Sequence, residues 1–315
     1  MKHRTSAATT GSRQDPSDMP ELDGVHHRFV DLPGLRMHIA EAGTGAPVLL
    51  LHGALQHWWA WREVIPALAE RYRVLAPDLR GFGWTDAPVS GYTGRRMTAD
   101  LIAALDASDV GELHVVSTDL GAIAGFGLCY DQPERVRAHV AIGVPPLAMK
   151  VGLRHVKAFL PLWHQQVGAV PVLAPALFAR GSQPLARHML CDFSPEGEPP
   201  DPDEVEAYLA RLRIPGRARA ASATLRRLVL PELARIAAGR YRRGVSATPT
   251  LVLTGSEDRA FPPSMAEDLV RTAEAHVASL DFGIIDGAAH YVAQENPAGL
   301  LDRLLPFLAQ ARGSR

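Results

Sequence analysis

The amino-acid sequence predicts an α/β protein in which helices flank a mostly parallel β-sheet and a helical insertion interrupts the core. Three observations predict this class. Short apolar runs such as 46–51 (APVLLL) and 72–77 (YRVLAP) are typical of buried strands, and helical segments alternate with them. One run, 113–127, has a single reactive residue between strand and helix. The segment 145–244 is rich in Leu, Ala and Arg and contains no comparable strand.

Composition excludes several function classes. The chain has 315 residues, which suits one large globular domain with an insertion. Lys+Arg number 33 against Asp+Glu 34, so no charge excess favours nucleic acid or an acidic membrane. The arginines between 211 and 227 are interpreted as solvated helix faces. No apolar run is long enough for a membrane span. Cys129 and Cys191 form neither a disulfide framework nor a metal pattern, so a reducing cytoplasm is expected.

The elements divide the chain into three parts. Residues 1–24 have no apolar core, so a disordered tail is predicted rather than a signal peptide. The α/β core is expected over 25–144 and 245–315, and a helical cap over 145–244. Strands are predicted at 27–32, 35–41, 46–51, 72–77, 113–116, 136–142, 249–254 and 279–285, and core helices at 61–71, 96–108 and 297–312.

The segment 113–127, LHVVSTDLGAIAGFG, has the layout of a nucleophile elbow, in which a strand, a tight turn and a helix follow one another. In the pattern G-x-S-x-G, Ser117 takes the place of the first glycine, Gly121 that of the second and Asp119 that of the nucleophile. An aspartate there changes the chemistry from acyl transfer to alkyl transfer. The alternative is that Asp119 only caps the following helix.

Two later residues support the catalytic interpretation. Asp258 follows the strand PTLVLT, and His290 follows the strand that ends at Ile285. The order nucleophile, acid, histidine, each at the carboxyl end of a strand, is typical of a hydrolytic triad. Asp258 would hold the imidazole of His290 in one tautomer and stabilise its charged form. Each residue alone could be a helix cap, but the order and spacing of all three favour the triad.

These motifs resemble the α/β-hydrolase superfamily, and within it the epoxide hydrolase and haloalkane dehalogenase branch, over about residues 25–308. The stretch HGALQHWWAWR is similar to the epoxide hydrolase form H-G-F-P-x-x-W-Y-x-W-R, with Trp58, Trp61 and Arg62 in register. The stretches RVLAPDLRGFGWTDAP, VSTDLG and DQPERVRAHVAIGVPP also resemble segments of that branch. The resemblance implies the α/β-hydrolase fold.

The resemblance also implies a two-step mechanism. The carboxylate of Asp119 opens an epoxide and forms an alkyl ester, and His290 then activates a water that hydrolyses the ester to a diol. The backbone N–H groups of Ala54 and Leu120 would form the oxyanion hole, while the side chain of His52 is expected to stabilise its loop. No metal or organic cofactor is needed. The expected partner is a small apolar substrate, and the chain is expected to be a monomer or homodimer.

Several residues depart from the family pattern. Leu120 replaces the tryptophan that helps dehalogenases bind halide, which argues against a typical dehalogenase. Leu55 replaces a proline. Typical epoxide hydrolases also have two cap tyrosines that bind the epoxide oxygen. The segments that should carry them, 159–168 and 222–226, contain none, and Tyr208 is interpreted as a packing residue.

Four residues are therefore predicted to contact the substrate: Trp58, Trp163, His164 and Tyr291. Trp163 and His164 are the candidates for protonating the epoxide oxygen, although each could simply pack in or line the cap. Three other functions stay open from the residues alone. They are a dehalogenase or other hydrolase with the same triad, a non-catalytic protein that binds a ligand under the cap, and a lyase or cyclase that uses Asp119 as a base.

Overall fold

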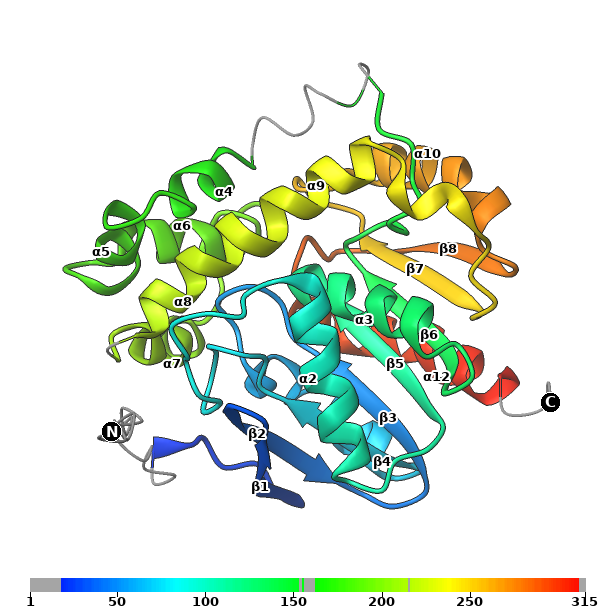
Figure 1. Cartoon of the computed structure of the whole chain (residues 1–315), viewed down its shortest axis with the longest axis horizontal. Coiled ribbons are helices and arrows are strands. Elements are labelled where there is room, and N and C mark those ends of the chain that lie inside the picture. Colours follow the sequence, from blue (N-terminus) through cyan, green and yellow to red (C-terminus); the bar gives the residue numbers. More distant parts are fainter. Residues whose placement is uncertain (1–17, 153–154, 156–161, 215, 312–315) are drawn as a thin grey trace, which may run out of the picture.

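One eight-stranded sheet organises the molecule (Figure 1). The computed structural model describes residues 18–152, 155, 162–214 and 216–311. The strand order is β1-β2-β4-β3-β5-β6-β7-β8. The pairs β1–β2 and β2–β4 are antiparallel, and the remaining neighbours are parallel. The strands are β1 Val25–Leu32, β2 Leu35–Ala42, β3 Ala46–Leu51, β4 Tyr72–Pro77, β5 Leu113–Thr118, β6 Val136–Ile142, β7 Thr250–Gly255 and β8 Leu280–Ile285.

Helices cover both faces of this sheet. In Figure 1, α2 and α3 lie in front of the sheet and α12 lies behind it. The core helices are α1 Ile65–Ala69, α2 Gly94–Asp106, α3 Asp119–Asp131, α10 Pro263–Ala273, α11 Val292–Glu295 and α12 Pro297–Gln310, with 3₁₀ turns η2 Trp58–Trp61 and η6 Glu274–His276. The predicted α/β class, with a mostly parallel sheet between helices, is therefore confirmed.

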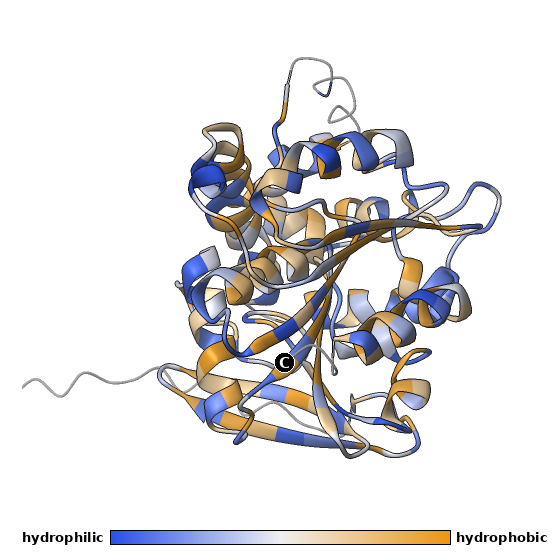
Figure 2. Ribbon diagram, turned by 90° about the vertical axis from the view of Figure 1, so that its right-hand side faces the viewer, coloured by the Kyte–Doolittle hydropathy of each residue, from blue (hydrophilic) through white to orange (hydrophobic). Residues whose placement is uncertain are grey.

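The central strands are buried because both faces of the sheet are covered. Every residue of β5 and β7 is buried. Figure 2 shows long hydrophobic stretches along the strands and mixed colouring on the outer helices. Leu51 at the end of β3 lies opposite Ser117 of β5, and Gly255 of β7 lies opposite Ile285 of β8. The loops that follow these strands therefore leave the sheet at the same edge.

Between β6 and β7 the described residues form helices and no strand. We call residues 145–244 the cap segment. Its helices are α4 Trp163–Gly168, α5 Leu173–Ala179, α6 Pro184–Cys191, α7 Pro202–Leu212, α8 Arg217–Thr224 and α9 Leu230–Ala237, followed by the 3₁₀ turn η5 Arg240–Arg243. A π-helical turn, η4 Leu225–Val229, joins α8 to α9. Turns of this kind often occur at functional sites, and this one faces the carboxyl edge of the sheet.

Two local predictions were wrong. The helix expected at 61–71 is shorter, because η2 ends at Trp61 and α1 covers only Ile65–Ala69, with Pro66 in its first turn, where a missing N–H is tolerated. Residues 18–24, which belong to the predicted tail, also contact the folded protein. The Asp18 carboxylate accepts a hydrogen bond from Trp84 Nε1 at 2.7 Å, and Leu22 packs against the core. Residues 1–17 lie outside the described part of the chain.

The interpretation of the arginine cluster as a solvated surface is corrected for two of its members. Arg211 and Arg217 are buried. Arg211 donates to the Gly83 carbonyl at 3.2 Å and lies 4.2 Å above the ring of Trp84. A guanidinium can stack on an aromatic ring in this way, and the sequence alternation of Arg with Ala did not reveal it. No helix in the described ranges is long and apolar enough to cross a bilayer.

Candidate active site

The turn after β5 has the predicted elbow geometry. Thr118 ends the strand in extended conformation, and Asp119 begins α3 with φ 46°, in the left-handed region that side chains rarely adopt. The chain passes very close to β3 at this point. A Cβ added to Gly121 would lie 2.4 Å from the Leu51 carbonyl oxygen, so no larger residue fits there. The turn therefore holds Asp119 in a strained, fixed position at the sheet edge.

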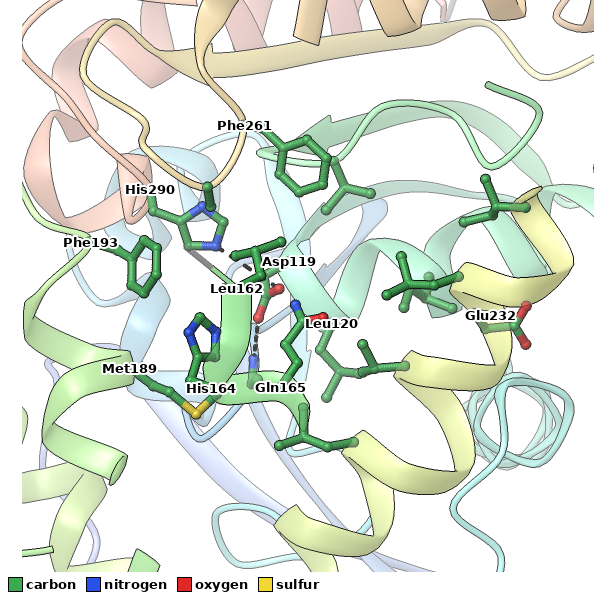
Figure 3. Close-up of a pocket in the computed structure, with 18 of the residues that line it drawn as sticks. Asp119, Leu120, Leu162, His164, Gln165, Met189, Phe193, Glu232, Phe261 and His290 are labelled. Atoms are coloured by element: carbon green, nitrogen blue, oxygen red, sulfur yellow. Dashed lines mark hydrogen bonds and ion pairs between the residues drawn. The ribbon is translucent and has the colours of Figure 1, made fainter. Parts of the chain in front are cut away.

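The two carboxylate oxygens of Asp119 have different surroundings. Oδ2 accepts a hydrogen bond from Ala54 N at 2.7 Å, whereas Oδ1 lies 4.0 Å from His290 Nε2 (Figure 3). The backbone N–H of Leu120 lies in the first turn of α3, where it has no acceptor within the helix. The structure therefore brings the predicted oxyanion-hole residues Ala54 and Leu120 beside Asp119, at a helix N-terminus that favours negative charge.

The loop after β3 is fixed by buried polar groups. His52 Nε2 accepts from Leu79 N at 2.9 Å, so its Nδ1 carries the proton and donates to the Gly53 carbonyl at 2.8 Å. Burial lowers the pKa of His52, which favours this neutral form. Leu55, where the family has proline, has φ 65°. His52 thus has the loop-stabilising position predicted for it, and it orients the Gly53–Ala54 peptide, whose N–H donates to Asp119 Oδ2.

His290 and Asp258 lie together at the same edge. His290 Nδ1 is 3.1 Å from Asp258 Oδ2, and Asp258 Oδ1 accepts from the backbone N–H groups of Ala260 and Phe261 at 2.7 and 3.0 Å. Burial alone would lower the pKa of His290, but the negative charges of Asp258 and Asp119 outweigh it and raise the pKa to about 9. With Nδ1 donating to Asp258, Nε2 is the ring nitrogen that faces Asp119.

Glu295 supports His290 from behind, and the sequence reasoning missed it. Its Oε2 accepts from Ala289 N at 2.7 Å and from Tyr291 N at 3.1 Å. These are the backbone N–H groups of the residues before and after His290. Burial raises the pKa of Glu295 to about 7. The available signal was a glutamate five residues after the histidine, at the end of α11.

A cavity lies between this edge and the cap segment. With its mouth it encloses about 870 Å³, and Asp119 and His290 both line it. Aliphatic and aromatic side chains form most of the wall (Figure 3), among them Leu120, Ile123, Phe193, Leu225 and Phe261. A mostly apolar cavity with a few convergent polar groups is typical of a small-molecule site.

Two of the four predicted substrate contacts reach this cavity. His164 and Tyr291 line it, and the Tyr291 hydroxyl donates to the Met189 carbonyl. The other two are corrected. Trp58 is fully buried below the site, with its backbone N–H on Asp78 Oδ1 at 2.8 Å, and it is not part of the wall. On α4, His164 and Gln165 face the cavity. Trp163 lies on the other side of the helix, and its side chain is 50% exposed.

The position expected for the second cap tyrosine is apolar. Leu225, at the second position, lines the cavity. Residues 159–161 of the first segment lie outside the described residues, and Leu162 lines the cavity. Tyr208 is buried against His57, as its interpretation as a packing residue requires, and Tyr241 donates its hydroxyl to Glu232. Sequence reasoning also missed Gln165, which lines the cavity beside His164.

Comparisons with known proteins agree with this geometry. Epoxide hydrolase 3 of Siraitia grosvenorii is 37% identical over 141 residues, which cover 44% of this chain and 45% of that protein. The soluble epoxide hydrolase of Corynebacterium sp. (strain C12) is 27% identical over 91% of this chain and 98% of its own length. The structure of epoxide hydrolase VrEH1 from Vigna radiata superposes with a TM-score of 0.77 at 27% identity, covering 93% of this chain and 100% of that one.

The family model described as alpha/beta hydrolase fold matches residues 46–297, a segment that contains Asp119, Asp258 and His290. The match covers most of the chain, and the sheet order and the edge at which these residues meet agree with it. The protein therefore belongs to the α/β-hydrolase fold family, and it is a hydrolase.

Proposed function

We propose that this protein hydrolyses an apolar epoxide to a diol through a covalent ester on Asp119. The observation that carries the proposal is the position of the Asp119 carboxylate, which lines an apolar cavity with one oxygen on Ala54 N and the other facing His290 Nε2. The names of the relatives supply the substrate class, because both curated relatives described above are epoxide hydrolases.

In the first step Oδ1 of Asp119 attacks a ring carbon of the epoxide. Oδ2 is the less available oxygen, because it already accepts from Ala54 N at 2.7 Å. The new C–O bond forms as the bond from that carbon to the ring oxygen breaks, and the bonding pair goes to the ring oxygen, which then takes a proton from solvent water and becomes the first hydroxyl group. The product is an alkyl ester whose carbonyl oxygen, Oδ2, stays at the backbone N–H groups of Ala54 and Leu120.

In the second step His290 acts as a base. Its Nε2 takes a proton from a water molecule, and the resulting hydroxide oxygen attacks the ester carbon of Asp119. Negative charge develops on Oδ2, where the two N–H donors lie, and a single donor of this kind typically contributes about 10²- to 10³-fold in rate. The tetrahedral intermediate expels the alkoxide, which takes the proton from His290, and Asp119 keeps the oxygen of the water.

His164 and Tyr291 line the wall that the bound substrate would contact. We propose that they shape the cavity and that the cap segment covers the substrate. The apolar wall supports a largely hydrocarbon substrate, because such a cavity offers it contacts that water cannot match.

A single turnover in heavy-oxygen water tests the mechanism. With enzyme in excess over epoxide, the ester route predicts that the new diol oxygen comes from Asp119, so the diol contains no heavy oxygen and the peptide with Asp119 gains it. Direct attack of water on the epoxide would put heavy oxygen into the diol and leave Asp119 unlabelled. That result would contradict the proposal.

A further inference from the structure

We propose that the carboxamide of Gln165 binds the epoxide oxygen during ring opening, in place of the tyrosines that the cap segment lacks. This inference rests on the proposed function and identifies the residue that stabilises the leaving oxygen. Gln165 lies in the third position of α4, and its side chain lines the cavity together with Asp119 and His290.

The direction of ring opening requires a donor from the cap segment. In a displacement at a saturated carbon, the attacking and leaving atoms lie on opposite sides of that carbon. Asp119 attacks from the core, at the N-terminus of α3. The breaking C–O bond therefore points away from the elbow, toward the helices that close the cavity from the other side.

The described cap residues offer few polar groups along the cavity wall. Leu225 and Leu162 present carbon. Glu232 accepts hydrogen bonds from the Tyr241 hydroxyl and from Arg235, and Figure 3 shows its carboxylate directed away from Asp119. A carboxylate held in this way cannot donate. His164 and Gln165 are the polar side chains on the part of the wall that faces the catalytic residues.

Gln165 is directed at the reacting group. Figure 3 shows its side chain extending from α4 toward the carboxylate of Asp119. Its Oε1 is buried and, among the residues that the structure describes, has no hydrogen-bond partner. An unsatisfied buried polar atom costs about 1–3 kcal/mol, so the protein does not fix the carboxamide at its oxygen end, and the amide can reorient when a ligand binds. A primary amide also has two N–H donors, and rotation of the amide can present either end.

The packing of α4 explains why Gln165 is directed inward. A Cβ added to Gly168 would lie 2.3 Å from Leu225 Cδ1, so the glycine allows α4 to approach the π-helical turn closely. Trp163 and Gln166, on the opposite side of this short helix, are exposed. The same contact therefore turns His164 and Gln165 toward the cavity.

Gln165 acts in this scheme by hydrogen bonding and not by proton transfer. As Asp119 Oδ1 bonds to carbon, the electron pair of the breaking bond moves to the ring oxygen, which becomes an alkoxide. The alkoxide accepts a hydrogen bond from Gln165 Nε2 and takes its proton from a water molecule. The amide keeps both of its hydrogens, so it stabilises the developing charge as a donor in an oxyanion hole does.

The test measures ester formation alone. In the His290→Gln background, where the ester accumulates, the rate constant of ester formation is measured by rapid quenching and intact mass. Adding Gln165→Leu is expected to lower it by roughly 10²- to 10³-fold, the usual effect of losing one such donor. Gln166→Leu is the matched control on the exposed side of α4 and is expected to leave the rate unchanged. An unchanged rate with Gln165→Leu, or an equal loss with the control, would overturn the inference.

A second variant separates donation from packing. Gln165→Glu keeps the shape of the side chain, and its protonated carboxyl can donate, whereas its ionised form repels Asp119 and the alkoxide. The ratio of its ester-formation rate to that of the His290→Gln parent is expected to fall as pH rises through the pKa of the introduced carboxyl. A ratio independent of pH would overturn the inference. If the parent forms no ester on Asp119, the proposed function itself fails; if only the Gln165 effects are absent, this inference fails alone.

Discussion

His290 Nε2 lies 4.0 Å from Asp119 Oδ1, while Asp119 Oδ2 accepts from Ala54 N at 2.7 Å. The first distance is too long for a hydrogen bond, and the second is a strong one. The backbone therefore holds Oδ2 of the carboxylate, and Oδ1 makes no such contact with Ala54. The negative charge of Asp119 nevertheless raises the pKa of His290.

Asp119→Asn is expected to lower the pKa of His290. Asp119 is one of the charges that raise that pKa to about 9, and the asparagine amide is neutral. The alkyl ester is neutral as well, so its formation should bring His290 toward the unprotonated form that the second step needs. Titration of the imidazole by NMR measures the shift, with the exposed Asp302→Asn as control. Equal pKa values in Asp119→Asn and wild type would contradict the coupling.

Stability should fall with rising pH because of His290. Its pKa is about 9 in the folded protein against an ordinary value of 6.5, so its contribution is fully present below pH 6.5 and is lost as pH rises through 9. The loss is on the order of 3 kcal/mol, from roughly 1.4 kcal/mol for each pKa unit. Urea unfolding between pH 7 and 9.5 measures it. The decrease of the free energy of unfolding with pH should be much smaller in His290→Gln. An equal decrease in both proteins would contradict the assignment of this effect to His290.

Glu295→Leu is expected to slow hydrolysis of the ester more than its formation. The variant leaves the buried N–H groups of Ala289 and Tyr291 without their acceptor, and these groups fix the loop around His290. If the cost of about 1–3 kcal/mol for these unpaired groups falls on the second step, the rate of that step decreases roughly 5- to 160-fold. Glu295→Gln retains an acceptor oxygen and should recover much of the rate. Pre-steady-state kinetics measures the rates of ester formation and ester hydrolysis separately. Equal decreases in both rates would contradict the idea that Glu295 acts by positioning His290.

Gly121→Ala should destabilise the protein, and Gly111→Ala should not. The added methyl group at Gly121 would meet the Leu51 carbonyl oxygen at 2.4 Å, whereas nothing lies within 4 Å of one added at Gly111. Overpacking of this kind costs about 1–3 kcal/mol, while a strain-free Gly→Ala change stabilises by roughly 0.4–1 kcal/mol. Chemical unfolding of the two variants measures the difference. Equal stabilities would mean that the elbow relaxes away from β3.

The sequence predicted the core strands and the elbow because their signals are local. Buried parallel strands are continuous apolar runs, and the small residues around Asp119 mark a turn that passes close to β3. Asp258 and His290 could be predicted for a related reason. Each follows its own strand, and the parallel sheet brings the ends of those strands to one edge.

The residues that contact the cavity could not be predicted in the same way. Trp58 lies close in sequence to Ala54, yet its backbone N–H donates to Asp78, and its side chain is buried outside the cavity wall. On α4, the sequence WHQQ contains no aliphatic residue that would mark a buried face, and only the packing of Gly168 against Leu225 decides which side chains face inward. Such a choice depends on contacts between distant segments, which helical periodicity within one short helix does not encode.

The measurement that tests the central claim most directly is the mass of His290→Gln after mixing with an apolar epoxide. Without its base the variant should complete the first step and stop. We expect the intact mass to rise by the mass of the epoxide, the adduct to map to the peptide that contains Asp119, and Asp119→Asn in the same background to abolish it. An unmodified Asp119 peptide, under conditions in which the wild-type protein forms diol, would contradict the covalent mechanism.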